Sequence, residues 1–205
     1  MAVRLTRSQQ TAATREDLLA AARRVFADRG YHAASLDEVA REAGYTKGAV
    51  YSAFGAKGRL FLAVYEREME RRWSTVEEEV EASLAAGEQR DPGERGARDF
   101  FARMQAEGPW LLALMEFRLH AARDPELNAA YAELHRAALE RLAGVLRRLT
   151  DVDDAAAQEA ALANMALGNG FALEHLVLPA DASEERFVRA SSAVAQALLT
   201  TTSGR

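Results

Sequence analysis

The chain has 205 residues, a formal net charge of −5, 49% hydrophobic and 28% charged residues, and no cysteine. This composition excludes a disordered segment, and the lack of cysteine excludes disulfides, cysteine-ligated zinc and thiol nucleophiles. No apolar run of about 18 residues occurs and the first residues lack the apolar core of a signal peptide, so we expect a cytoplasmic protein with no membrane partner.

Ala, Leu, Arg and Glu dominate and almost nothing alternates with period 2, so we expect an all-α fold. A first helix is predicted over 14–29, where Gly30 stops it, and a second begins at a capping box of Ser35 and Glu38 and ends near 43. Thr46 caps a third helix that ends near Phe54. A fourth follows over 57–86, then a loop over 87–96, and five more helices are expected at 97–107, 109–123, 125–149, 153–178 and 183–201.

The second and third predicted helices, joined at Gly44, form a candidate helix-turn-helix. Small residues at Gly48 and Ala49 let the start of the third helix approach the floor of a DNA major groove, whereas Val50 and Phe54 are expected to face inward. The polar side chains that can contact bases or phosphates are Thr46, Lys47, Tyr51 and Ser52. An ordinary helical hairpin inside a bundle is the alternative.

The charge is divided unevenly along the chain. Residues 1–60 hold ten Lys or Arg and six Asp or Glu, a net charge of +4, and the other 145 residues hold 16 and 25, a net charge of −9. A basic amino-terminal part on an acidic remainder favours contact with a polyanion, and chance variation of surface charge is the alternative.

The amino-terminal segment resembles the DNA-binding domain of the tetracycline-repressor (TetR) family. The resemblance rests on TREDLLAAARRVFADRGY at 14–31 and SLDEVAREAGYTKGAVY at 35–51, continued by Phe54, Lys57 and Leu60. It implies an all-helical homodimer with a helix-turn-helix domain, 1–56, that binds a palindromic operator in double-stranded DNA. A second helical domain, 57–205, would bind a small-molecule effector and form the dimer. The roles that it implies are groove contact for Thr46, Lys47 and Gly48, contact with a phosphate or a thymine methyl group for Tyr51, and phosphate contact for Ser35 and Lys57.

The resemblance also shows two departures from the family pattern. Ala53 stands where the family often has a histidine that contacts phosphate. Ala56 and Gly58 weaken the start of the fourth helix, which predicts a soft hinge between the two domains.

The middle helices carry large apolar side chains at helical spacing, which suit either a hydrophobic core or an adaptable cavity for an apolar ligand. The candidate effector-binding residues are Tyr65, Met69, Trp73, Phe101, Met104, Trp110, Phe117, His120, Tyr131 and His135. Asn164 and His175 are further polar candidates. Glu116 lies within the apolar run 111–119, so we expect it to pair with an arginine or to face a cationic ligand.

The last two predicted helices are rich in alanine, serine and glycine between stripes of larger apolar residues. Small residues allow close helix packing, so two such helices from each subunit would suit a four-helix dimer interface, with packing inside one chain as the alternative.

No nucleophile elbow, P-loop or metal-ligand spacing occurs, so we expect no enzyme, no cofactor and no metal site. The sequence therefore favours a repressor that a small apolar or amphipathic ligand releases from DNA. The alternative is an architectural or division-linked DNA-binding protein without an inducer, and activation in place of repression depends on the operator's position.

Overall fold

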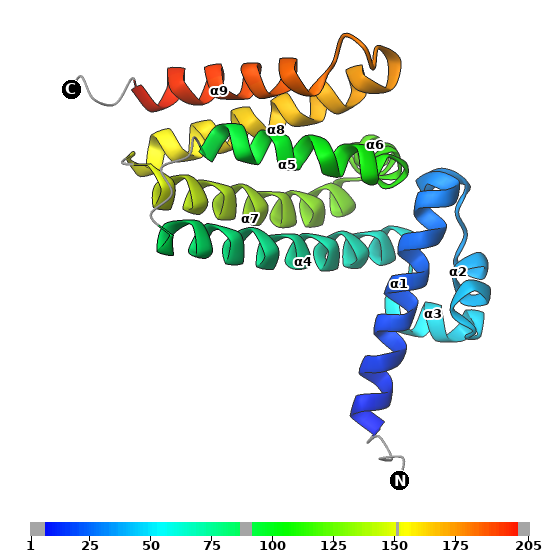
Figure 1. Cartoon of the computed structure of the whole chain (residues 1–205). Coiled ribbons are helices and arrows are strands. Elements are labelled where there is room, and N and C mark those ends of the chain that lie inside the picture. Colours follow the sequence, from blue (N-terminus) through cyan, green and yellow to red (C-terminus); the bar gives the residue numbers. More distant parts are fainter. Residues whose placement is uncertain (1–6, 87–91, 151, 201–205) are drawn as a thin grey trace. The chain divides into compact units, whose positions relative to one another are not determined.

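The computed structural model describes residues 7–86, 92–150 and 152–200. Within those ranges the chain forms nine α-helices and no strand (Figure 1). The predicted all-α class is confirmed. The helices are α1 (Arg7–Ala33), α2 (Leu36–Ala43), α3 (Lys47–Phe54), α4 (Lys57–Ala85), α5 (Pro92–Ala106), α6 (Gly108–Ala121), α7 (Pro125–Leu149), α8 (Asp154–Val177) and α9 (Glu184–Thr200).

Two predicted boundaries are wrong. The first helix begins at Arg7 and not near Thr14, and 92–96, predicted as loop, form the first turn of α5. Proline at the first position of a helix and Glu94 in the first turn both favour a helix start there. The rest of the predicted loop, 87–91, lies outside the described residues.

The chain divides into two compact units. The head unit consists of Met1–Glu70 and Glu107–Glu133, and the body unit of Arg71–Ala106 and Leu134–Arg205. The head unit therefore contains α1 to α3, the first part of α4, all of α6 and the start of α7. The domain boundary at residue 56 stays a prediction.

Local sequence signals account for the ends of the short helices α2 and α3. The Ser35 hydroxyl accepts a hydrogen bond from the Glu38 amide, and the Glu38 carboxylate accepts one from the Ser35 amide, so the predicted capping box is confirmed. Gly44 ends α2 in the left-handed region, at φ 75° and ψ 24°. Thr46 caps α3 by accepting from the amide of Ala49.

Aromatic side chains from α1, α4 and α6 form the core of the head unit. Phe26, Phe61 and Phe117 are fully buried. The Phe61 ring stacks on Phe117 at 4.4 Å between centroids and on Trp110 at 4.9 Å, and it meets Phe26 edge to face. This cluster explains why α6, distant in sequence, packs along α1 in the same unit.

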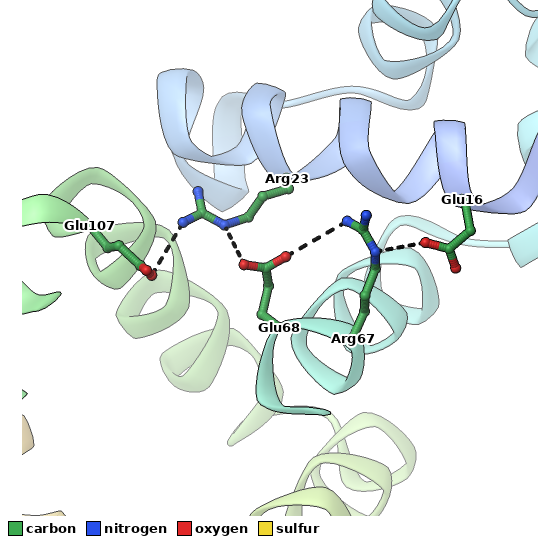
Figure 2. Close-up of polar contacts among 5 residues, drawn as sticks. All are labelled: Glu16, Arg23, Arg67, Glu68 and Glu107. Carbon is green, nitrogen blue, oxygen red and sulfur yellow. Dashed lines mark hydrogen bonds and ion pairs between the residues drawn. The ribbon is translucent and has the colours of Figure 1, made fainter. Parts of the chain in front are cut away.

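A chain of ion pairs joins the same three helices at the surface of that core (Figure 2). The Arg23 guanidinium lies 3.4 Å from Glu68 on α4 and 3.4 Å from Glu107, the residue before α6, and it covers the Trp110 ring at 4.6 Å. Arg67 continues the chain from Glu68 to Glu16 on α1. Arg23 thus links α1 to both other helices by charge and by its planar face.

Among the described residues Glu116 pairs with no arginine, so that arm of the expectation is wrong, and the cationic ligand stays a prediction. Its carboxylate accepts a hydrogen bond of 3.0 Å from the amide of His32, just after the break in α1 at Gly30. Gly30 has a φ of 75°, and a Cβ added there would lie 2.6 Å from a Glu116 oxygen. Glycine is required both for this backbone conformation and for the close approach of the carboxylate.

The body unit is built mainly from small side chains. One buried cluster consists of Ala143, Leu146, Ala157, Ala160 and Ala161. Helix α9 packs on both α5 and α8. No helix in the described ranges is long and apolar enough to cross a membrane.

Larger rings occur where α5, α8 and α9 meet in the body unit. Phe187 lies 5.2 Å from Phe100 and 5.1 Å from Phe171, measured between ring centroids. A Cβ added at Gly168 would lie 2.9 Å from the Phe100 ring, so this glycine allows the helices to approach.

Candidate functional site

The exposed face of α3 carries the predicted groove-contacting residues. Tyr51 is 46% exposed, and Thr46, Lys47, Gly48 and Ser52 are exposed as well. On the other side of the helix Val50 and Phe54 are buried, as predicted, and hold α3 on the core. The polar face of α3 therefore lies outside the core of the head unit.

Lys47 has a defined position on this face. Its ammonium lies 2.7 Å from a carboxylate oxygen of Asp37 on α2 and 5.7 Å from the centre of the Tyr51 ring. The hydrogen bond to Asp37 raises the pKa of Lys47 above its ordinary value, because the ion pair favours the charged form. Sequence reasoning did not select Asp37, because a carboxylate on its own suggests repulsion from DNA.

Two residues with implied phosphate roles already have partners within the head unit. The Ser35 hydroxyl belongs to the capping box, and Lys57 donates hydrogen bonds of 3.0 and 3.1 Å to the carbonyl oxygens of His32 and Ala34. Lys57 also lies 4.7 Å from the centre of the Tyr31 ring, and burial lowers its pKa. It fastens the end of α1 to the start of α4. The residue after it, Gly58, predicted as part of a soft hinge, would place an added Cβ 3.0 Å from Leu127.

Other cations of the head unit are neutralised at the surface. Arg24 pairs with Glu42 at 2.8 Å, and Arg59 pairs with Glu126 at 2.8 Å. Arg15, by contrast, lies over the ring of Phe54 at the end of α3, at 4.8 Å. The Arg24–Glu42 pair is already counted in the charge excess of 1–60, whereas the Arg59–Glu126 pair reduces that excess.

Six of the ten candidate effector-binding residues lie in the head unit. Tyr65, Trp110, Phe117 and Tyr131 are buried, His120 is half-buried, and Met69 is half-buried on α4. The Tyr131 ring lies 5.4 Å from Tyr65 and 5.7 Å from Phe117, and burial raises the pKa of Tyr131. The His120 ring lies 5.1 Å from the Tyr31 ring. These rings already form one continuous apolar cluster.

The remaining four candidates belong to the body unit. Trp73, Phe101 and Met104 are buried there, and His135 is half-buried. Phe101 lies 5.1 Å from the ring of His175, whose Nδ1 lies 2.9 Å from the carbonyl oxygen of Ala182. Asn164 donates to the carbonyl oxygen of Ala160 on its own helix. The effector-binding role of all ten residues stays a prediction.

Two family models match the chain. The model described as bacterial regulatory proteins, tetR family, matches residues 18–64, and the model described as tetracyclin repressor-like, C-terminal domain, matches residues 88–201. Together they cover the helix-turn-helix and most of the remaining helices.

Curated relatives are transcriptional regulators. The activator FasR of Mycolicibacterium smegmatis is 48% identical over 62 residues, which are 30% of this chain and 28% of FasR. The repressor AcnR of Corynebacterium efficiens is 28% identical over 127 residues, which are 62% of this chain and 60% of AcnR. The chain thus spans less than two thirds of the length of either relative.

The fold extends over nearly the whole chain of a solved structure. A TetR-family transcriptional regulator from Mesorhizobium loti superimposes with a TM-score of 0.69 at 22% identity, covering 96% of this chain and 98% of the other. This similarity confirms the arrangement of an amino-terminal helix-turn-helix followed by a helical carboxy-terminal part.

Proposed function

The chain belongs to the TetR family of bacterial DNA-binding transcriptional regulators, and on that premise we propose that it represses transcription from a palindromic operator until a small apolar or amphipathic ligand releases it. Both activators and repressors occur among the relatives, as FasR and AcnR illustrate. Repression is the simplest consequence of a protein that covers its operator and leaves it when a ligand binds.

The observation that carries the DNA-binding proposal is the two-sided character of α3. Buried Val50 and Phe54 fix the helix on the core, while Lys47, Tyr51 and Ser52 point away from it and are exposed. A recognition helix needs this division, because base contacts require exposed side chains that a rigid scaffold positions.

The test is selection of bound sequences from a random double-stranded library, followed by binding of the selected operator. We expect a palindrome with half-site centres roughly 34–36 Å apart, or a multiple of that distance. Tyr51→Ala should weaken binding by about 1–3 kcal/mol if the ring or hydroxyl contacts a base, and Tyr51→Phe separates the two contributions. Unchanged affinity after loss of both Lys47 and Tyr51 would exclude α3 as the recognition helix.

Regulators of this family act as dimers, and we place the dimer contact of this chain on α8 and α9. Helix α8 carries exposed large apolar side chains, namely Leu162, Leu173, Leu176 and Val177, and Leu178 follows it. Ala166 and Gly170 between them are exposed and small, so a second helix can approach closely. A dimer supplies the two recognition helices that a palindrome needs.

We place the effector site at the aromatic cluster of the head unit around Tyr65, Phe117 and Tyr131. A ligand that separates these rings would move α4 and α6 against α1, because all three helices share that core. Such a shift favours a conformation with a different spacing of the two recognition helices.

The effector proposal is tested by titrating each ligand found in a screen, with and without operator DNA. A coupling of about 1–3 kcal/mol is usual, and linkage requires that DNA weaken ligand binding by the same factor. Equal ligand affinity with and without DNA would contradict the proposal that the ligand releases the protein from its operator. A screen in which no ligand changes DNA binding would favour the architectural or division-linked protein.

A further inference from the structure

Asp37 introduces a negative charge into the surface proposed to contact DNA. It lies in the first turn of α2, and its side chain is 60% exposed. One of its oxygens lies 2.7 Å from the Lys47 ammonium, and the other accepts a hydrogen bond of 2.9 Å from it. The carboxylate of Asp37 thus positions the ammonium group of Lys47.

Asp37, Lys47 and Tyr51 form one patch, which spans the start of α2 and the first two turns of α3. Lys47 and Tyr51 are four residues apart and lie on the same side of α3, with the ammonium 5.7 Å from the ring centre. A lysine without such a partner would swing to the nearest phosphate, which contributes affinity but no sequence preference.

An ionised carboxylate accepts hydrogen bonds and donates none. In the major groove it is therefore repelled by the O6, N7 and O4 acceptors and accepts a hydrogen bond from an exocyclic amino group, above all N4 of cytosine. In a C·G pair N4 donates to O6 of guanine, so these two atoms lie about 2.9 Å apart. That spacing is close to the 2.7 Å between the Lys47 ammonium and Asp37.

We propose that Asp37 is a specificity-determining residue that, together with Lys47, reads one C·G base pair in each half-site. The carboxylate accepts from cytosine N4 and the ammonium donates to guanine O6, so both members of the ion pair keep a partner of opposite polarity. Guanine or thymine at the cytosine position would present an acceptor to the carboxylate. This inference rests on the proposed recognition role of α3 and adds the base pair that it selects.

The experiment is the random-library selection, carried out with full-length wild type, Asp37→Ala and Asp37→Asn. Wild type should enrich cytosine at one half-site position and bind an operator with that pair inverted roughly tenfold to a hundredfold more weakly. Asp37→Ala should reduce that preference to below about threefold. Asp37→Asn should shift the preferred base to adenine, because asparagine both donates to N7 and accepts from N6.

Glu42→Gln is the matched control, because it removes one negative charge from the same helix. Glu42 pairs with Arg24 on α1 and not with Lys47, and both side chains of that pair are exposed. It should tighten binding to every sequence about equally and leave the preferred bases unchanged.

Three results would overturn the inference. A cytosine preference that Asp37→Ala retains would exclude the carboxylate as its cause. A loss of preference in Glu42→Gln equal to that in Asp37→Ala would assign the effect to net charge. If wild type enriched no motif at all, both the recognition role of α3 and this inference would be wrong. If wild type enriched a motif that does not depend on Asp37, only this inference would be wrong. Circular dichroism and thermal unfolding of each variant check that the helical fold and its stability are retained.

Discussion

The two units of the molecule bury different kinds of side chain. The head unit has a core of stacked rings, in which Phe26, Phe61 and Phe117 are fully buried. The body unit buries mainly alanines, and several of its leucines on α8 are exposed. Both units bury large apolar side chains, such as Phe117 in the head unit and Phe101 and Phe187 in the body unit, but the body unit also leaves several leucines of α8 at the surface.

The difference indicates two routes to stability. The head unit buries Val50 and Phe54, the two residues that hold α3, within its own chain. The body unit leaves an apolar face uncovered, which a second copy of the chain would bury. Substitutions in the two units should therefore differ in what they break.

The largest effect is expected at Phe117. Phe117→Ala removes a fully buried ring that contacts Phe61, Tyr31 and Tyr131, and it should lower the free energy of unfolding by about 3–5 kcal/mol. Urea denaturation measures it. Leu119→Ala on the same helix, where the side chain is 63% exposed, should change that energy by less than about 0.5 kcal/mol. Similar losses for the two variants would contradict the head-unit core.

Ala166→Arg should break the dimer and leave the fold of each chain intact. The long charged side chain would stand in the exposed apolar face of α8, and we expect the dissociation constant to rise about a hundredfold or more. Light scattering at micromolar concentration compares the masses. The same substitution at exposed Ala102 on α5 is the control and should leave the dimer unchanged. If the Ala166→Arg variant were still a dimer, the dimer contact would not lie on this face of α8.

Gly168 and Gly170 test how closely the body unit is packed. A Cβ at Gly168 would lie 2.9 Å from the Phe100 ring, so Gly168→Ala should destabilise the chain by about 1–3 kcal/mol despite alanine's better helix propensity. In the described part of a single chain an added Cβ at Gly170 has nothing within 4 Å, so Gly170→Ala, measured in the monomeric Ala166→Arg background, should stabilise by up to about 1 kcal/mol. Thermal unfolding shows whether each substitution raises or lowers the stability. If both changed the stability in the same direction, α8 would not approach Phe100 as described.

The smallest effect concerns pH and the cap of α2. Hydrogen bonds from the Ser35 hydroxyl and amide hold the pKa of Glu38 below its ordinary value of 4.5. Because the folded pKa is the lower one, the stabilisation is present above the ordinary pKa and is lost as the pH falls through the folded value. Urea midpoints from roughly pH 7 to pH 3 should therefore fall more for wild type than for Glu38→Gln. Parallel curves would show that the box contributes no pH dependence.

Local signals allowed most of the helical structure to be predicted. Caps at Ser35 and Thr46 and the turn at Gly44 depend on residues within one helical turn, so the sequence contains all their partners. The early start of α1 was missed, because 7–13 are polar and show no apolar periodicity.

Long-range partners could not be predicted in the same way. The partner of Glu116 is the His32 amide, 84 residues away, and no sequence pattern marks a free backbone amide. Lys57 matched a phosphate-contacting position by type, yet its ammonium is taken by two backbone carbonyls. Helical periodicity identified the candidate effector residues as buried, but it does not show which helices share a core. The structure divides these residues between the two units.

The discontinuous composition of the head unit has a consequence for biosynthesis. Its first segment ends at Glu70 and its second comprises Glu107–Glu133, so 36 residues of the body unit are translated between them. At about 5–20 residues per second, the ribosome completes α1 to α3 several seconds before it has made Trp110 and Phe117. During that interval Tyr31 and Phe61 lack the Phe117 ring of α6 that they contact in the finished protein. The aromatic core of the head unit is therefore completed only when the nascent chain has been extended through α6.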